Sequence, residues 1–291
     1  MNCTWSDRFM VVPHQKISLA KDYDPDYKDD FSNKEQAKEQ LQVGIKQLAE
    51  YQDILYAQNT YALLLIFQAM DAAGKDSTIK HVMSGINPQG CQVFSFKQPS
   101  AEELDHDYLW RYFKALPERG RIGIFNRSYY EEVLVVRVHP ELLQAQQLPP
   151  EKKNERIWYQ RFEEINNFEK YLVNNGIIIL KFFLNVSKEE QKNRFLARIK
   201  QPEKNWKFSA SDVREREFWD DYQAAYEDVF NHTSTEWTPW YIIPANHKWF
   251  TRLVVADLIV DKLASLNLHY PVISQQHYQA LLQAKIKLEQ E

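Results

Sequence analysis

Short apolar runs alternate along the chain with longer polar segments that have helical spacing. Each run is bounded by polar or turn-forming residues, which is typical of a strand buried on both faces of a sheet. We expect strands at Tyr61–Phe67, Cys91–Phe96, Arg121–Phe125, Ile177–Leu184 and near Trp240–Ile243. Because strands that alternate with helices form parallel sheets covered on both faces, the pattern predicts an α/β fold with three layers.

Capping residues and helical spacing place the helices between these strands. Three Ser/Glu pairs have capping-box spacing: Ser32 with Glu35, Ser100 with Glu103, and Ser187 with Glu190. The first opens a long polar helix to about Gln58, and the second opens a helix that carries HDYLWRYF. We expect four more helices at about Lys75–Ser84, Glu151–Asn175, Asp212–Phe230 and Lys248–Asn267.

The sequence predicts a short arm and one large domain. Residues 1–31 are polar, aromatic and irregular, and we interpret them as an arm that wraps the surface. Residues 32–291 show no internal repeat and no low-complexity linker, so we expect a single domain. A basic, aromatic loop that contains a proline lies at about 200–216 and is expected to act as a lid over that domain.

Composition excludes several classes of protein. The net charge is −4, so the chain lacks the overall basic excess of nucleic-acid-binding proteins, and any polyanion site must be a local cluster. Its two cysteines cannot supply a disulfide framework, which favours a reducing cytoplasm. Met1–Pro13 has no apolar run typical of a signal peptide. We expect no membrane span, because the apolar runs are far shorter than the roughly 20 residues a bilayer requires.

The segment Gln68–Ser77, QAMDAAGKDS, joins a predicted strand to a predicted helix and places Gly74 directly before Lys75. That context is the one that a phosphate-binding P-loop requires. Backbone N–H groups and the dipole at a helix N-terminus attract anions, and the lysine can follow the outer phosphates. The sequence therefore predicts a P-loop kinase domain, with phosphates bound by Ala72, Ala73, Gly74, Lys75, Asp76 and Ser77.

Three residues distinguish this loop from the common pattern G-x-x-x-x-G-K-[ST]. Ala69 replaces the first glycine, and Asp76 replaces the metal-binding Ser or Thr. Asp71 is the most informative, because a carboxylate inside a phosphate cradle repels its ligand unless a cation lies between them. Mg²⁺ favours one or two carboxylates with phosphate oxygens and waters, so Asp71 predicts a magnesium site. The alternative is an ordinary helix start with acidic residues and an incidental lysine.

The strand at Arg121–Phe125 runs directly into Asn126 and Arg127. Ligands of open α/β sheets bind at the carboxyl ends of strands, so these two side chains are expected at the same site as the loop. The Arg127 guanidinium can bind phosphoryl oxygens through two donors. Glu131 follows one helical turn later, and Arg137 ends the next apolar segment. The alternatives are a surface ion pair for Arg127 and a solvated position for Glu131.

Basic residues are concentrated in the segment 181–216. Arg194 and Arg198 are four residues apart on one helix face, where like charges are destabilising unless an anion lies against them. Lys204 and Lys207 follow in the predicted lid, which can close over phosphates and exclude water. The alternatives are a solvated basic helix face and a nucleic-acid site, and no nucleic-acid motif accompanies this segment.

The remaining candidate residues supply no competing chemistry. His81, His106 and His139 lack the spacing of a zinc site, and no Ser/His/Asp grouping can be argued. Phosphoryl transfer requires mainly positioning and charge stabilisation. We therefore expect direct in-line transfer without a covalent enzyme intermediate. The aromatic residues at helical spacing in 218–230 are interpreted as core.

Taken together, these segments resemble the second family of polyphosphate kinases. The similarity is close in residues 68–90, 96–111, 120–141, the lid and 238–255, and it covers most of the chain from about 35 to 265. The resemblance implies a fold similar to that of thymidylate kinase, with a three-layer core and a helical lid. It also implies transfer of phosphate between inorganic polyphosphate and nucleoside mono- or diphosphates, with Mg²⁺ as cofactor, usually in a homo-oligomer.

The resemblance also implies roles for individual residues. The residues matching Asp71 and Lys75 are essential to the magnesium and phosphate site, and Arg127 belongs to a second motif. Arg194 and Arg198 match lid arginines that line a polyphosphate tunnel. Many family members have Asp at position 126 and Asn at position 131; Asn126 with Glu131 resembles the subgroup that accepts both AMP and ADP.

The main hypothesis is a polyphosphate-dependent nucleotide kinase. Its expected catalytic residues are Asp71, Lys75, Arg127 and Glu131, and its expected nucleotide-binding residues are Asp76, Lys80, Asn126, Arg127 and Arg137. Polyphosphate is expected on the loop and on Arg194, Arg198 and Lys207. The rivals are an ATP-dependent nucleoside monophosphate kinase of the same fold and a non-catalytic polyanion-binding protein. The base preference, the direction in cells and the number of metal ions do not follow from the sequence.

Overall fold

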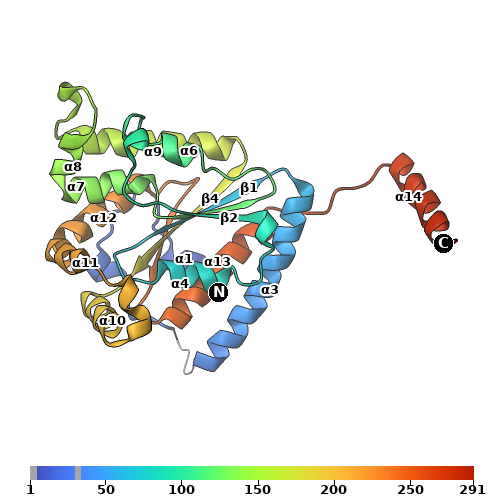
Figure 1. Cartoon of the computed structure of the whole chain (residues 1–291), viewed down its shortest axis with the longest axis horizontal. Helices are drawn as coiled ribbons and strands as arrows, with labels where there is room; N and C mark the ends of the chain where they lie inside the picture. Colours follow the sequence, from blue (N-terminus) through green and yellow to red (C-terminus); the bar gives the residue numbers. More distant parts are fainter. Residues whose placement is uncertain (1–4, 30–33) are drawn as a thin grey trace.

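The core of the computed structural model is a five-stranded, wholly parallel sheet with the strand order β2-β3-β1-β4-β5 (Figure 1). The structure describes residues 5–29 and 34–291. The strands are β1 (Ala62–Gln68), β2 (Cys91–Ser95), β3 (Ile122–Asn126), β4 (Ile177–Asn185) and β5 (Trp240–Pro244). All five lie at the apolar runs identified in the sequence, so the predicted parallel α/β sheet is confirmed.

Helices cover both faces of the sheet and complete the predicted three layers. One face carries α1 (Trp5–Phe9), α3 (Lys34–Gln58), α4 (Lys75–Val82) and α13 (Lys248–Ser265), which pack mainly through α13. The opposite face carries α7 (Val135–Val138), α9 (Ile157–Asn174) and α12 (Trp219–Thr233), together with the 3₁₀ helix η2 (Tyr129–Val133). None of the helices in the described ranges is both long and apolar enough to cross a bilayer.

The central strands are apolar throughout because both of their faces are covered. Every residue of β1 and β3 is buried, whereas the edge strand β2 has no fully buried residue. Burying one Leu, Ile or Phe side chain stabilises a fold by about 1.5–3 kcal/mol, so these strands provide a rigid base for the loops at their carboxyl ends. The first residues of those loops therefore have well-defined positions.

Three predicted helices differ from those in the structure. The helix expected to carry HDYLWRYF is two short helices, α5 (Ala101–Leu104) and α6 (Trp110–Phe113). The Ser100 capping box is present, but Asp107 accepts a hydrogen bond from the Leu109 N–H at 2.9 Å and so stabilises a turn between them. The helix expected from Glu151 begins at Ile157, and the one expected at Asp212–Phe230 is broken.

The broken segment belongs to the predicted lid. Helix α10 (Lys188–Lys200) is capped by Ser187 as expected, and it is followed by η4 (Pro202–Lys207), α11 (Ala210–Glu215) and η5 (Arg216–Phe218) before α12 begins. Pro202 at the start of η4 separates this segment from α10. The short helices thus give the segment 200–218 its own compact fold beside the carboxyl end of the sheet.

The N-terminal segment packs on the edge of the sheet, whereas the C-terminal helix stands apart from it. Met10 and Val11 lie along β5, where the Val11 N–H donates to the Trp240 carbonyl at 2.8 Å. The same N-terminal segment includes α2 (Leu19–Asp22), whose Leu19 N–H donates to Glu227 of α12. Ser32, the predicted cap of α3, lies outside the described residues. Helix α14 (Gln275–Leu288) was not expected, and it stands away from the body with all of its residues exposed (Figure 1). The remaining short helices are η1 (Pro88–Gly90), α8 (Pro140–Ala145) and η3 (Pro150–Lys152).

Candidate functional site

The turn between β1 and α4 has the backbone of a phosphate cradle. Ala72 and Gly74 both have positive φ, 60° and 116°, so the chain reverses within residues 69–74 before α4 begins at Lys75. A φ of 116° is strained for any residue with a Cβ, which explains why a chain with only seven glycines uses one here. The turn aims the free N–H groups of the first turn of α4 at the carboxyl edge of the sheet.

Lys75 is buried beneath this turn. Its Nζ donates a hydrogen bond of 2.8 Å to the Ala69 carbonyl, so one of its three donors is engaged and the ammonium group lies inside the loop. Burial, and then the neighbouring Arg127 guanidinium, lower the pKa of Lys75 to about 8. A bound anion would relieve both effects, because it restores a partner to the charge that burial has desolvated.

Arg127 connects the ends of β1 and β3. Its N–H donates to the Phe67 carbonyl at 3.0 Å, and its φ is 67°, which turns the side chain back toward the loop. One terminal nitrogen, Nη2, donates to Oδ1 of Asp71 at 3.0 Å, while Nη1 lies 3.9 Å from Oε2 of Glu131. Glu131, and then Asp71, raise the pKa of Arg127, so the guanidinium remains charged.

Glu131 and Asn126 are also held by neighbours in the site. Glu131 accepts a hydrogen bond from the Gln68 amide at 2.9 Å. Asn126 donates to the Asp76 carboxylate at 2.7 Å and to Ser95 at 3.4 Å. The carboxyl ends of β1, β2 and β3 and the start of α4 therefore meet through two adjacent groups of hydrogen bonds, one around Arg127 and one around Asn126.

Arg194 has a different role from the one that the sequence analysis expected. Its Nε donates to Glu190 at 2.7 Å, and its other four contacts go to the carbonyls of Ala72, Ala73, Ala245 and Asn246. Since arginine has five N–H donors, the side chain has none left for a phosphate. Arg194 instead ties the P-loop to the end of β5, although its edge still lines the cavity described next.

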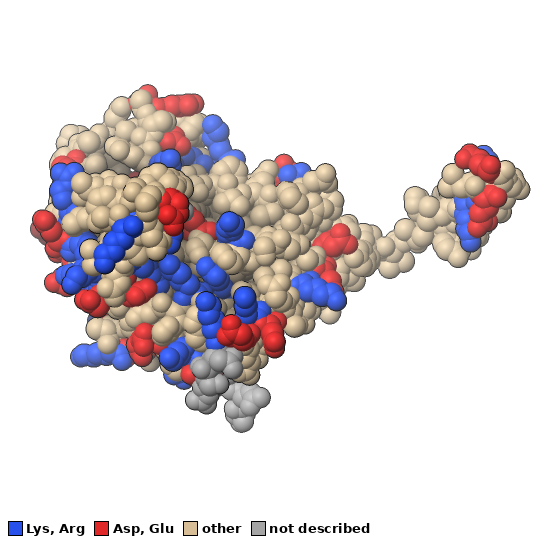
Figure 2. Space-filling view, turned by 60° about the horizontal axis from the view of Figure 1, so that its bottom comes forward, with Lys and Arg blue, Asp and Glu red and all other residues tan. Residues whose placement is uncertain are grey.

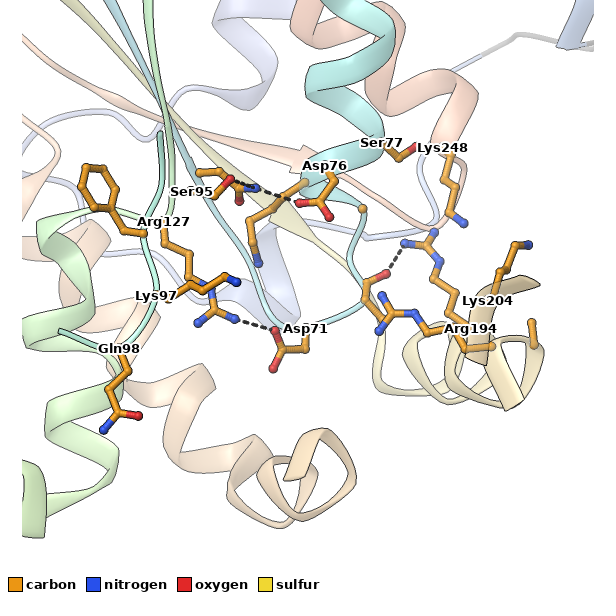
Figure 3. A pocket seen from close by; sticks show the side chains of 17 residues that line it. Asp71, Asp76, Ser77, Ser95, Lys97, Gln98, Arg127, Arg194, Lys204 and Lys248 are labelled. Carbon is orange, nitrogen blue, oxygen red and sulfur yellow. Dashed lines mark hydrogen bonds and ion pairs between the residues drawn. The ribbon is translucent and has the colours of Figure 1, made fainter. Parts of the chain in front are cut away.

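A cavity of about 690 Å³ opens over the loop (Figure 3). Lys97, Arg127 and Asp71 lie on one side of it, with Arg194, Lys204 and Lys248 on the other. Its full lining is Asp71, Ala72, Gly74, Lys75, Asp76, Ser77, Ser95, Phe96, Lys97, Gln98, Asn126, Arg127, Arg194, Ala197, Arg198, Lys204 and Lys248. Positive side chains outnumber the two carboxylates, and Figure 2 shows Lys and Arg gathered on the face that this view turns forward.

A second cavity of about 370 Å³ adjoins the first and shares Asp71, Gln98 and Arg127 with it. Its character is different, because it combines four carboxylates with apolar and aromatic groups. Those carboxylates are Asp71, Glu131, Asp212 and Glu215, and the other lining residues include Met70, Leu134, Val135, Arg216, Tyr222 and Tyr226. The Asp71–Arg127 pair thus stands at the boundary between a basic cavity and an acidic, aromatic one.

The structure brings most of the predicted site residues together. Ten of them line the basic cavity: Asp71, Ala72, Gly74, Lys75, Asp76, Ser77, Asn126, Arg127, Arg194 and Arg198. Glu131 lines the second cavity, and Ala73 is buried beneath the loop with its carbonyl on Arg194. Arg198 also lies 3.6 Å from Asp212, an ion pair that connects α10 to α11.

Two predicted nucleotide-binding residues lie elsewhere. Lys80 is exposed on α4 and lines neither cavity. Arg137 lines neither cavity and forms an ion pair with Asp228 of α12, so its charge supports packing between α7 and α12. The side chain of Lys207 lies outside what the structure describes, and Lys204 of the same segment lines the basic cavity.

Sequence reasoning missed Lys97, Lys248 and the aromatic wall of the second cavity. Lys97 directly follows the predicted strand at Cys91–Phe96, and Lys248 follows the last strand, so the rule that ligands bind at strand ends could have identified both. Tyr222 and Tyr226 are buried, as the helical spacing predicted, yet they also face the second cavity. No pattern in the sequence distinguishes these two tyrosines from core residues.

The carboxylates fit a metal that arrives with its own oxygen ligands. In the described part of the chain no three His, Cys, Asp or Glu side chains cluster as a metal-binding group. Asp71 lines both cavities, and Asp76 lines the basic one. Mg²⁺ commonly takes one or two carboxylates and completes its shell with phosphate oxygens and waters, which this donor set allows.

Comparisons with known proteins agree with this site. Residues 31–270 match the sequence profile of Polyphosphate kinase 2 (PPK2). The chain is 52% identical over 285 residues to the ADP-polyphosphate phosphotransferase of Rhodopseudomonas palustris, which covers 97% of both proteins. It is 43% identical over 265 residues to the AMP/ADP-polyphosphate phosphotransferase of Meiothermus ruber, covering 91% of this chain and 95% of that one.

A solved structure shows the same similarity in three dimensions. The crystal structure of polyphosphate kinase 2 from Arthrobacter aurescens superposes with a TM-score of 0.83 at 41% sequence identity. The match covers 91% of this chain and 92% of the other. The sheet, its covering helices and the P-loop are therefore those of a known P-loop kinase fold.

Proposed function

We propose that this chain, which belongs to the polyphosphate kinase 2 family, transfers a phosphoryl group between inorganic polyphosphate and the nucleotides AMP and ADP. The observation that carries the proposal is the pair of adjoining cavities that meet at Asp71 and Arg127. One cavity suits a chain of phosphates and the other suits a nucleoside. Relatives with 52% and 43% identity are named as ADP-polyphosphate and AMP/ADP-polyphosphate phosphotransferases.

Polyphosphate is assigned to the basic cavity. The backbone of residues 72–77 and the ammonium group of Lys75 bind the phosphates nearest the loop. Lys97, Arg198, Lys204 and Lys248 neutralise the units further out, because they line the remaining walls. Arg194 supports this binding indirectly, since it holds the Ala72 and Ala73 carbonyls and so fixes the direction of the loop.

The nucleoside is assigned to the second cavity. Four carboxylates would repel a long polyanion, but they can accept hydrogen bonds from ribose hydroxyls and base amino groups. Tyr222 and Tyr226 supply aromatic surface for the uncharged part of the ligand. Only the phosphate end of the nucleotide must reach the shared boundary, where Arg127 offers positive charge.

Asp71 is the residue that would hold Mg²⁺, with phosphate oxygens and waters as the other ligands. The ion would supply positive charge between this carboxylate and the phosphates that it otherwise repels. Glu131 lies on the other side of Arg127 and limits the direction in which that guanidinium can turn. Asn126 with Glu131 also resembles the subgroup of the family that accepts both AMP and ADP.

The transfer itself is direct and in line. A terminal phosphate oxygen of the nucleotide attacks the last phosphorus of polyphosphate, and the bridging oxygen leaves with the shortened chain. Arg127 neutralises the transferring group, and Lys75 stabilises charge on the phosphates that it contacts. Because the two sides of the reaction are both phosphoanhydrides when ADP accepts, the same site also runs from ATP to polyphosphate.

The enzyme is proposed to work in the cytoplasm as a homo-oligomer, as the family resemblance implies. The small number of cysteines supports a reducing compartment. These assignments do not affect the chemistry above, which uses residues of one chain.

One assay separates this function from its two rivals. The protein is incubated with Mg²⁺ and AMP or ADP, with polyphosphate or ATP as donor, and the nucleotides are separated. Polyphosphate-dependent formation of ADP and ATP is expected. An ATP-dependent monophosphate kinase would phosphorylate AMP with ATP alone, and a non-catalytic binder would give no product with either donor.

A further inference from the structure

A fully buried charged cluster lies against Tyr129 and Tyr130, which follow β3. It takes no part in the reaction steps proposed above. Glu169 of α9 and Lys181 of β4 are both inaccessible to solvent, and Oε2 of the first lies 2.7 Å from Nζ of the second. Tyr129 and Tyr130 each donate a hydroxyl hydrogen bond of 2.8 Å to Oε1 of Glu169, and Thr238 donates one of 2.6 Å to Oε2. All acceptor positions of this carboxylate are therefore filled.

All three hydrogen-bond donors of the Lys181 ammonium group are also engaged. Besides Glu169, its ammonium group contacts the Tyr130 hydroxyl at 2.9 Å and donates to the Thr233 carbonyl at 2.7 Å. Burial raises the pKa of Tyr129 and Tyr130 well above the ordinary value, so both remain protonated donors. Both charged groups of the cluster have their hydrogen-bonding positions filled and are inaccessible to solvent, which makes it a structural device and not a second site.

Stability alone does not explain a cluster of this kind. Replacing a buried ion pair with apolar groups of similar volume is often neutral or stabilising, because desolvation offsets the attraction between the charges. The directional hydrogen bonds do provide something that apolar packing does not, namely fixed positions for the groups that make them. The role of Glu169 therefore depends on which groups its hydrogen bonds hold in place.

The fixed groups belong to the segment that builds the transfer site. Arg127 and Glu131 face the cavities, whereas the three residues between them, 128–130, are inaccessible to solvent. Tyr129 and Tyr130 open the five-residue 3₁₀ helix η2, which is too short to hold its own position. Arg127 in turn has a left-handed backbone, which depends on the structure around it for support.

We propose that Glu169 is a positioning residue for phosphoryl transfer. Through the hydroxyl groups of Tyr129 and Tyr130 it fixes residues 127–131, and it thereby holds Arg127 against the transferring phosphoryl group. This inference rests on the proposed function, because the role of Arg127 does. It adds a buried residue of α9 that lines neither cavity to those on which turnover depends.

The test removes both hydroxyl tethers and keeps the aromatic rings. The double variant Tyr129→Phe/Tyr130→Phe is chosen because loss of Glu169 would leave the charge of Lys181 unpaired in the core and could unfold the chain. We expect kcat for ATP formation from ADP and polyphosphate to fall about tenfold, with both KM values unchanged within about twofold, because binding groups outside this segment are untouched. Amide exchange of residues 127–131 is expected to become faster.

Two comparisons distinguish positioning from a general loss of structure. In an Arg127→Lys background the tyrosine changes should cause no further fall in kcat, since the group that they position is gone. The control Gln52→Met removes a buried polar group that accepts from the Asn87 N–H at the other end of the molecule, and it should lower the melting temperature without changing kcat.

Three results would overturn the inference: an unchanged kcat, an equal fall with and without Arg127, or unchanged exchange of residues 127–131. The exchange measurement requires no activity. If the wild-type protein formed no product, the proposed function would fail on that result alone, while exchange would still decide whether the tyrosines anchor the segment.

Discussion

The Arg127 guanidinium donates a 3.0 Å hydrogen bond to the Asp71 carboxylate at the boundary between the two cavities. Asp71 alone would repel phosphates, whereas Arg127 attracts them, and each group neutralises the other in this pair. Binding of a metal to Asp71 would release Arg127 toward a phosphoryl group. The pair therefore holds Arg127 neutralised until phosphates and a metal arrive.

Lys75→Met should abolish most turnover without weakening the fold. The side chain has similar length but no charge, and the wild-type ammonium group is buried with a lowered pKa. We expect kcat to fall by about 100-fold or more, which corresponds to loss of a charge-stabilising contact. The melting temperature should stay equal or rise, because a desolvated charge has been removed. A variant with near-normal kcat would exclude the loop from the mechanism.

Lys248→Ala should weaken polyphosphate binding selectively. Lys248 lines the basic cavity at the start of α13, away from the acidic cavity. We expect the KM for polyphosphate to rise about fivefold, as for loss of one phosphate contact, while the KM for ADP changes little. The matched control is Lys80→Ala, which removes an exposed lysine outside both cavities and should leave both KM values unchanged.

Arg194→Lys distinguishes a loop-holding role from a phosphate-binding role. The lysine keeps the positive charge but has three donors in place of five, so several buried carbonyls lose their partners. We expect a loss of about 3 kcal/mol of stability and a lower melting temperature, together with reduced kcat. If Arg194 served only as a charge for polyphosphate, this variant would keep its stability and most of its activity.

Binding of polyphosphate should weaken as the pH rises above 8. Burial lowers the pKa of Lys75 to about 8, so the free protein loses this charge between pH 7 and pH 9, in a range where ordinary lysines keep theirs. The dissociation constant, measured by calorimetry, should rise about tenfold between those two values. The Lys75→Met protein should lack this rise, and an equal rise in that variant would assign it to other groups.

Asp71→Asn should increase the Mg²⁺ concentration needed for half-maximal turnover by about tenfold or more, since an amide is a weaker ligand for a hard cation. Asp221→Asn is the matched control, because Asp221 is an exposed carboxylate of α12 outside both cavities. An unchanged Mg²⁺ requirement in the Asp71 variant would remove this carboxylate from the metal site.

The fold and half of the site follow from local patterns in the sequence. Each strand is an apolar run bounded by polar residues, and the runs of β1, β2 and β3 end at residues that line a cavity or adjoin one that does, as with Asn126 and Lys97. The P-loop is equally local, since Gly74 and Lys75 are adjacent. These features depend on residues that are close together in the sequence, so the spacing of residues was enough to predict them.

The remainder depends on contacts between distant segments. Arg194 was expected to bind polyphosphate because it shares a helix face with Arg198, but its partners are carbonyls 51 to 122 residues away. Arg137 was expected to bind the nucleotide, but its guanidinium forms an ion pair with Asp228 instead. The spacing of charges cannot reveal which of them will be neutralised by such partners. The second cavity is lined by both α11 and α12, which are separate helices where the pattern predicted one.

The most direct test of the central claim is a phosphorus NMR time course of the wild-type protein with Mg²⁺, ADP and polyphosphate in one tube. We expect the signal of the internal phosphates of polyphosphate to fall as the ADP signals are replaced by those of ATP, with no release of free phosphate. In the time that the wild-type protein needs, the Lys75→Met protein should leave the spectrum almost unchanged. ATP formation at a wild-type rate in that variant, or polyphosphate that is lost only to free phosphate, would contradict this mechanism.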